Sequence, residues 1–236
     1  VMMIRLKDGK SEEPQRPQAQ EIRKPGFFEG FKAVFTTPTA LMLTIGFSGL
    51  IFVITGYLTW MPTYLHENFG MNLAGAGFHS MFYTHLFAFF GVLIAGALSD
   101  KIGVANPSRR MMLQGAGLLF SVPFIYMMGN SDALWVIYIG CAGFGFGRAF
   151  FDANTYTVLY DVTPPRLHSS CSSVMIMTGF GVGALAPVVL GAIKGSLGLS
   201  FGFTCLAAIW VICGVMLLVI SRTHYRKDYN TIKSTK

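Results

Sequence analysis

The sequence predicts an all-α membrane protein with six transmembrane helices, and three observations support this fold class. Hydrophobic residues make up 53% of the chain and charged residues only 12%, too few for the solvated shell of a soluble domain. The apolar residues come in long blocks rather than in amphipathic stripes, which is typical of helices embedded in lipid. The sequence also lacks the short alternating segments of a membrane β-barrel. Helix is then the expected spanning element, because it satisfies its own backbone hydrogen bonds.

A polar linker and a short aromatic segment precede the first apolar block. Residues 8–24 are polar, contain proline and glutamine and show no periodicity, which predicts a cytoplasmic linker. Residues 25–38, PGFFEGFKAVFTTP, alternate aromatic and polar positions. They predict a short helix in the membrane interface, with its phenylalanines in contact with lipid. The alternative is that they form the first turns of the next helix, but Pro38 favours a break.

Six apolar blocks follow, and each reaches the roughly 20 residues that a helix needs to cross a hydrocarbon core about 30 Å thick. The blocks are residues 39–65, 74–99, 110–129, 133–160, 170–193 and 199–221. With their flanks they divide the chain into a linker with the interfacial helix (1–37), a six-helix transmembrane unit (38–222) and a cytoplasmic tail (223–236).

Basic residues predict the orientation of these helices. They gather in the N-terminal segment, in the loops after the second and fourth blocks and in the tail, all on one side of a six-span topology. The opposite loops contribute only Lys194. By the positive-inside rule both ends of the chain are cytoplasmic. The same bias accounts for the net charge of +7, so the lipid bilayer and not nucleic acid is the predicted partner.

The four cysteines lie inside the predicted spans without paired spacing, which indicates small buried residues rather than disulfides or metal ligands. The sequence shows no cluster of cysteine and histidine typical of a zinc site. A membrane enzyme would need a nucleophile, a base or metal ligands together at membrane depth, and the sequence offers no such set. We therefore predict no cofactor, no metal and no enzymatic activity.

The loop between the second and third blocks, GALSDKIGVANPSRR, carries four predicted gating residues. Gly96 permits close helix approach and Gly103 permits a tight turn. Asp100, followed by Lys101, can accept hydrogen bonds from the N-terminus of a neighbouring helix. Such a clamp holds one conformation and breaks in another. The alternative is an ordinary positively charged cytoplasmic loop.

A second cytoplasmic loop, YDVTPPRLHSS, follows the fourth block. Its Asp161 and Arg166 are predicted to join a charge network with Asp100 and to take part in gating. A proline-rich turn with solvated charges is an equal alternative.

With these two loops the chain resembles the major facilitator superfamily. The Gly-x-x-x-Asp-(Arg/Lys)-x-Gly pattern of residues 96–103 is similar to the signature loop between the second and third helices of each six-helix half in that family. Asp161 and Arg166 fall in a segment similar to its acidic-x-x-Pro…Arg loop. The resemblance covers nearly the whole chain and implies the linker and C-terminal half of a transporter, with the N-terminal half missing. Residues 1–10 are then expected to end a preceding helix rather than to form a signal peptide.

The first block ends in GYLTWMPTYLHENFG, which resembles the corresponding segment of the anion:cation symporter branch. That branch carries organic anions and sugar acids. The resemblance implies that Tyr57 and Trp60 contact or gate a sugar-like substrate. Trp60 and Tyr64 can equally be interfacial anchors, and for Tyr64 this is the favoured interpretation.

Three ionisable residues lie at mid-membrane depth. His85 is in the middle of the second block, and Arg148 and Asp152 share a face of the fourth, four residues apart. A charge at the bilayer centre costs at least roughly 2.5–3.5 kcal/mol and is functional by default. Because a guanidinium suits a carboxylate, Arg148 and His85 are predicted to bind an anionic substrate, and His85 or Asp152 to exchange a coupled proton.

The structural alternative is a permanent Arg148–Asp152 ion pair with His85 bonded to a backbone carbonyl, and for Asp152 we favour it. Asn154 is a further candidate for substrate binding, and it is also expected to hydrogen-bond across helices. In the family that the chain resembles, the first, second, fourth and fifth helices line the cavity, which fits the positions of these residues. Pro187 is expected to loosen the fifth helix.

Together these features predict one half of a secondary active transporter in a bacterial inner membrane. It would move a small organic anion, such as a sugar acid, with protons as the coupling ion, by alternating access. Its partners would be the substrate, protons, the bilayer and the missing half. An efflux antiporter for neutral or cationic compounds and a substrate sensor that does not cycle are the alternatives.

Overall fold

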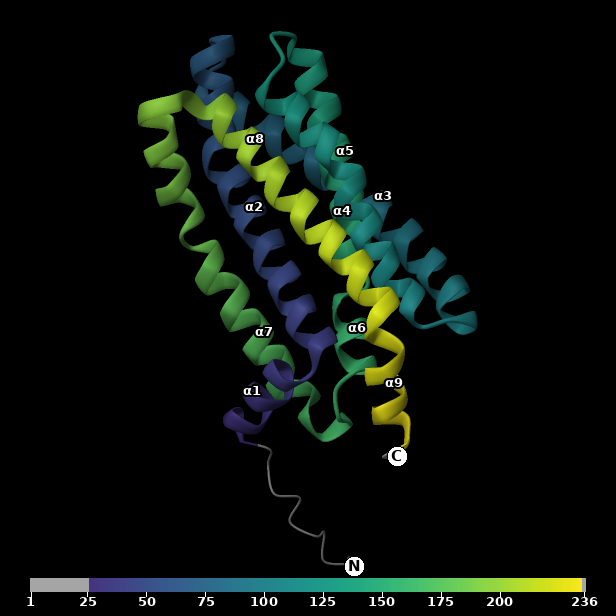
Figure 1. Cartoon of the computed structure of the whole chain (residues 1–236). Coiled ribbons are helices and arrows are strands. Elements are labelled where there is room, and N and C mark those ends of the chain that lie inside the picture. The colour runs from purple at the N-terminus through teal and green to yellow at the C-terminus, as the bar shows by residue number, and fades with distance from the viewer. Residues whose placement is uncertain (1–25, 235–236) are drawn as a thin grey trace, which may run out of the picture.

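The computed structural model describes residues 26–234, and all regular structure in that range is helical. Long helices run side by side, and the short helices α1, α6 and α9 gather at the end where the chain enters and leaves the bundle, here called the terminal end (Figure 1). The helices are α1 (Phe27–Thr36), α2 (Pro38–Phe69), α3 (Leu73–Ala105), α4 (Ser108–Gly129), α5 (Leu134–Asp152), α6 (Thr155–Asp161), the 3-10 helix η1 (Pro165–Leu167), α7 (His168–Gly183), α8 (Ala186–Thr223) and α9 (Tyr225–Ser234).

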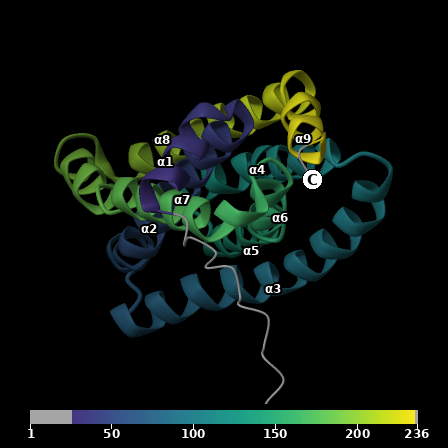
Figure 2. The same ribbon diagram turned by 90° about the horizontal axis from the view of Figure 1, so that it is seen from below.

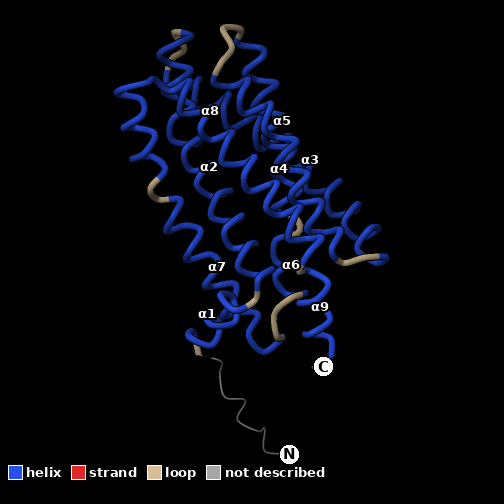
Figure 3. The backbone as a smooth tube through the Cα atoms, viewed as in Figure 1, coloured by secondary structure: helices blue, strands red, loops and turns tan. Residues whose placement is uncertain are grey.

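Five stretches of the described chain are long and apolar enough to span a membrane, and the last one holds two crossings. It covers Pro165–Thr223, 59 residues, about three times what one crossing needs. Gly198 interrupts it with φ 81° and ψ 163°, a conformation that glycine adopts readily and other residues do not. The chain reverses within α8 (Ala186–Thr223), far from the terminal end (Figure 3). The all-α membrane fold is confirmed, and this reversal accounts for the sixth predicted crossing.

The fourth predicted helix is interrupted directly after Asp152. The Asn154 side-chain amide donates to the Phe150 carbonyl at 3.0 Å, while the Asn154 backbone N–H bonds the Phe151 carbonyl at 3.1 Å. A side chain thus takes the carbonyl that the regular helix would use, which is how asparagine competes with helical structure. The single helix predicted over residues 133–160 is therefore wrong at this point, because it consists of α5 and α6.

The fifth predicted helix is also divided, between α7 and α8. The interruption lies at Ala184 and Leu185, directly before the first turn of α8, which contains Pro187. Proline lacks an N–H and its ring clashes with the preceding turn of a helix, so it fits best in the first turn. The helix is interrupted directly before Pro187, and the loosening expected there stays a prediction.

Short helices flank the transmembrane bundle at both ends of the described chain. α1 is separated from α2 at Thr37, as Pro38 predicts, and its phenylalanines at positions 27, 28, 31 and 35 are exposed. The predicted linker over residues 8–24 lies outside the described residues. The sequence predicts only a tail beyond residue 223, but the structure has α9 there. Its Asp228 accepts hydrogen bonds from the backbone N–H and the hydroxyl of Thr39, at 3.0 and 2.6 Å, and so satisfies the first turn of α2.

α3 lies along one side of the bundle and packs mainly on α5 (Figure 2). Glycines bring these two helices close together: a Cβ at Gly145 would overlap the carbonyl of Thr84, and one at Gly91 would overlap the carbonyl of Phe146. Small residues allow such backbone approach between membrane helices. The outer face of α3 carries many exposed large apolar side chains between residues 78 and 98. Such a face needs lipid or another apolar surface against it.

We expect Gly145→Ala to lower the free energy of unfolding by about 1–3 kcal/mol, because the added methyl group must push α3 away from α5. Thermal unfolding in detergent of the natural protein that contains this chain measures the change. The matched control is Gly77→Ala on α3, where a Cβ meets no other atom within 4 Å. Equal losses in both variants would contradict the close approach of α3 and α5.

Candidate functional site

Arg148 and Asp152 form an ion pair in the last turns of α5, just before the interruption of the fourth crossing. Nε of Arg148 lies 3.5 Å from Oδ2 of Asp152, and the side chains are 17% and 35% exposed. Within residues 26–234 the Arg148 side chain makes no hydrogen bond, and its buried Nε has no hydrogen-bond partner. A guanidinium has five donors. Arg148 therefore keeps donors free for a further acceptor.

Aromatic side chains pack beside this ion pair. Phe144, one turn before Arg148 on the same face of α5, has its ring centroid 4.8 Å from that of Tyr57 and 5.0 Å from that of Trp210. These three side chains are buried in the core between α2, α5 and α8. The charge thus lies next to a large apolar cluster, where its interactions are less screened than in water.

Tyr57 is 1% exposed and its hydroxyl is fully engaged with other helices. The hydroxyl lies 2.8 Å from the Ser80 carbonyl, 2.7 Å from the Thr84 hydroxyl and 3.3 Å from Cys141 Sγ. Tyr57 therefore links α2 to α3 and α5. In this structure it offers no surface to a substrate, so its expected substrate contact stays a prediction that would require the core to open.

His85 lies on the exposed outer part of α3. Its Nδ1 is 2.9 Å from the Met81 carbonyl, which confirms the bond to a backbone carbonyl that the structural alternative predicts. Because a carbonyl only accepts, Nδ1 carries the proton, and Nε2 of a neutral ring remains an acceptor. His85 is thus accessible and has a nitrogen available for a proton or a substrate hydroxyl.

Trp60 belongs to a cluster near the end of the bundle opposite the terminal end. Its Nε1 donates to the Pro187 carbonyl at 3.0 Å, which ties α2 to the start of α8. Lys194 Nζ lies 5.2 Å from the ring centroid of Trp60 and 2.6 Å from Glu67 Oε1. No local pattern in the sequence predicts the Lys194–Glu67 pair, because its members are 127 residues apart. The roles of Trp60 as a gate, a stacking platform or an interfacial anchor stay predictions.

Asp161 is the centre of a polar cluster at the terminal end. It accepts from Nη1 of Arg110 at 3.1 Å and from the Tyr225 hydroxyl at 2.8 Å, so it joins α6 to α4 and α9. Burial, followed by the adjacent Asp161 carboxylate, raises the pKa of Tyr225, which keeps this hydroxyl a neutral donor. A Cβ at Gly103 would overlap the Arg110 guanidinium. Gly103 therefore makes room for Arg110 within α3, and the tight turn predicted for it is wrong.

The predicted network of Asp100 with Asp161 and Arg166 is not formed. Asp100 and its neighbour Lys101 are exposed, and neither makes an ion pair or a side-chain hydrogen bond in the described part of the chain. Arg166 instead pairs with Glu29 of α1 at 3.3 Å. A Cβ at residue 96 would meet no other atom within 4 Å, so Gly96 does not make the close helix approach predicted for it. The gating roles of these residues stay predictions.

Asn154 is buried and both ends of its amide are engaged. The oxygen accepts from the Ser99 hydroxyl of α3, and the nitrogen donates to the Phe150 carbonyl. The predicted hydrogen bond across helices is confirmed. Through these two bonds Asn154 holds α3 against the interruption between α5 and α6, and its substrate contact stays a prediction.

The described residues contain no group of three or more His, Cys, Asp or Glu that could hold a metal ion. The four cysteines are free, and three of them are buried. The polar groups of the described crossings that remain accessible include Arg148, Asp152 and His85.

Comparison with known proteins matches the chain to one family model. The model, described as Major Facilitator Superfamily, matches residues 1–187 and, in a second alignment, residues 85–235. A crystal structure of a bacterial homolog of the human lysosomal transporter Spinster, inward-facing and unoccupied, has a similar fold. Its TM-score is 0.64 at 22% sequence identity, covering 95% of this chain and 54% of that one.

Two similar curated proteins are named as transporters of organic acids, and neither name is that of an enzyme. A probable L-galactonate transporter of Escherichia coli K12 is 26% identical over 72% of this chain and 38% of its own length. A cis,cis-muconate transport protein of Acinetobacter baylyi is 27% identical over 74% of this chain and 40% of its own length. The chain thus spans less than half the length of these two relatives.

We expect Tyr225→Phe to lower the free energy of unfolding by about 1–3 kcal/mol, because the Asp161 carboxylate loses a buried donor. Chemical or thermal unfolding in detergent measures the loss. The control is Tyr229→Phe, one turn along α9, whose hydroxyl makes no hydrogen bond among the residues that the structure describes. A loss no larger than that of the control would show that the hydroxyl contributes nothing.

Proposed function

Because the chain belongs to the Major Facilitator Superfamily, we propose that it is one six-helix half of a secondary active transporter for a small organic anion, with sugar acids as the preferred class. The observation that carries the proposal is the Arg148 guanidinium, which lies within an apolar crossing and has one partner at 3.5 Å. Galactonate and muconate, the molecules named in the relatives, both bear carboxylates.

A substrate carboxylate suits Arg148 better than a neutral sugar does. The planar guanidinium can donate two parallel hydrogen bonds to a carboxylate, and charge-assisted bonds are about twice as strong as neutral ones. Partial burial beside Phe144 strengthens the attraction further, because the local dielectric is low. A neutral polyol of the same length would leave the guanidinium charge uncompensated.

Although a structural ion pair was the favoured interpretation of Asp152 from the sequence, we propose it as the coupling group because its pair with Arg148 is long and partly exposed. When it is ionised it competes with the substrate for Arg148, and a proton on Asp152 removes that competition. Proton uptake and anion binding would then favour each other, as symport requires. His85, exposed on α3 with a free Nε2 acceptor, is the alternative proton carrier.

The other wall of the site would come from a second six-helix half. Support comes from the uncovered apolar face of α3 and from the length of the chain relative to the proteins it matches. In the proposed orientation the terminal end faces the cytoplasm of a bacterial cell, with the phenylalanines of α1 lying in the membrane interface.

Counterflow uptake in vesicles containing the natural protein tests the substrate class. We expect uptake of galactonate and other sugar acids but not of the matched neutral polyol galactitol. Arg148→Gln should reduce acid uptake at least about tenfold, since a hydrogen bond to a charged group is worth about 1.5–3 kcal/mol. Arg226→Gln, an exposed residue of α9, is the control for loss of one positive charge.

Two results would contradict the proposal. Uptake that does not distinguish acids from polyols would favour a carrier of neutral compounds. Acid uptake unchanged in Arg148→Gln, with the protein still folded, would make the ion pair a packing element only.

We expect Asp152→Asn to retain acid counterflow but to lose its dependence on pH, because the amide can neither compete for Arg148 nor exchange a proton. Initial uptake rates across the range from acidic to slightly alkaline pH provide the measurement, with Asp132→Asn, an exposed residue near the opposite end, as control. A pH profile unchanged in Asp152→Asn but flattened in His85→Gln would move the coupling role to His85.

A further inference from the structure

α4 has an apolar groove on its outer face that the proposed transport mechanism does not use. Near the terminal end the groove has a volume of about 310 Å³. Three helices contribute to it, with α4 as its floor. Its lining residues are Ile102 of α3, Arg109, Met112, Leu113 and Ala116 of α4, and Leu218 of α8.

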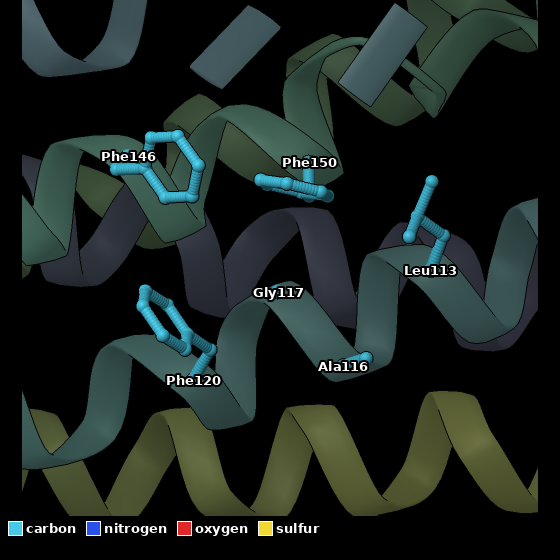
Figure 4. Close-up of a pocket in the computed structure, with 6 residues that line it drawn as sticks. All are labelled: Leu113, Ala116, Gly117, Phe120, Phe146 and Phe150. Carbon is cyan, nitrogen blue, oxygen red and sulfur yellow. The ribbon is translucent and has the colours of Figure 1, made fainter. Parts of the chain in front are cut away.

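A second pocket, of about 300 Å³, continues this groove between α4 and α5. The two pockets share Leu113 and Ala116. Figure 4 shows why there is space: the α4 floor is lined by small residues at Ala116 and Gly117, while Phe120 and Phe146 face each other at one end. The lining of this second pocket is aromatic and aliphatic throughout.

The length of the combined groove matches one leaflet of a bilayer. From Arg109 to Phe120 the chain advances eleven residues, which is about 16 Å along a helix axis. Half of a hydrocarbon core about 30 Å thick is about 15 Å. A groove of this length that begins at headgroup level would reach the middle of the membrane.

The groove lies away from the candidate substrate site. Phe146 and Phe150 line it, and each is two residues from Arg148 along α5. Two residues correspond to about 200° around a helix, so the two phenylalanines are on the face opposite to Arg148. An occupant of the groove would not touch the Arg148–Asp152 pair.

Among the described residues, the only charged side chain that lines either pocket is Arg109, at the headgroup end. Arg109 is exposed and makes no ion pair or side-chain hydrogen bond within residues 26–234, whereas the adjacent Arg110 turns inward to Asp161. Arg222 is exposed one turn beyond Leu218, on the α8 side of the same groove. Two arginines thus stand at the headgroup end of an apolar channel.

We propose that this α4 groove binds an acyl chain of an anionic phospholipid from the leaflet at the terminal end, with the lipid phosphate held by Arg109 and Arg222. An apolar channel one leaflet long fits an acyl chain. Unpaired arginines at its mouth fit a phosphate and select lipids of net negative charge, because juxtamembrane basic residues attract anionic headgroups. The site does not depend on what the protein transports.

Native mass spectrometry of the natural protein in non-ionic detergent tests this site. Phosphatidylglycerol and phosphatidylcholine with the same acyl chains are titrated separately, and the tightest bound lipid is quantified. We expect phosphatidylglycerol to bind more tightly. Arg109→Gln should weaken phosphatidylglycerol binding about fivefold, which is what one basic residue near an anionic surface contributes. Phosphatidylcholine binding should weaken less, because the choline ammonium of that lipid offsets the charge of its phosphate.

Two further variants separate the headgroup from the chain. Ala116→Phe fills the exposed floor of the groove and should weaken binding of both lipids. Lys227→Gln removes an exposed charge from α9, outside the groove, and should change neither. Equal binding of the two lipids by the native protein would overturn the proposal. So would phosphatidylglycerol binding that is unaffected by Arg109→Gln or by Ala116→Phe.

Discussion

Arg148 carries a positive charge at a depth where the surrounding helices offer mainly aromatic and aliphatic side chains. Asp152 balances this charge only in part, at 3.5 Å and without a hydrogen bond to the buried Nε. If a pair with this geometry were fully buried, its Coulomb attraction would not offset the free energy lost by desolvating both charges. The pair is instead partly exposed, so the charge is neither sealed in the core nor free in water. In the proposed mechanism, a substrate carboxylate displaces Asp152 from this partly exposed pair.

The position of this charge is set by close packing of α5 with α3. Gly91 and Gly145 let the two helices approach until backbone carbonyls limit the contact. The hydrogen bond from Ser99 to Asn154 holds α3 at the point where α5 ends and α6 begins. A recognition group held on packed helices keeps its geometry better than one held on a loop.

The sequence predicted the helices well because lipid imposes a simple rule on composition and length. It did not predict the division of the fourth crossing, because the competition of one Asn154 amide for one carbonyl has no periodic signature. The interactions of the charged residues at the terminal end were predicted less well. Asp161 finds its partners in Arg110 and Tyr225, 51 and 64 residues away, and only the folded chain shows which basic or hydroxyl group arrives there.

Residue type in the membrane proved more informative than local spacing. Arg148, Asp152 and His85 stood out in the sequence because charge is costly at that depth, and the structure leaves all three at least partly accessible. Gly96 and Gly103 were identified by a sequence motif. A Cβ at Gly96 would meet no neighbouring atom, whereas Gly103 makes room for the Arg110 side chain. A motif gives positions, whereas the contact that each glycine serves depends on its neighbours in three dimensions.

The central proposed role is that of Arg148, which receives the carboxylate of the substrate. Isothermal titration of the natural protein with galactonate and with galactitol, which differ at the carboxylate, tests this directly when repeated on Arg148→Gln. We predict at least about tenfold tighter binding of galactonate to the native protein and nearly equal binding of the two ligands to the variant. A preference for galactonate that survives in the variant would contradict this role.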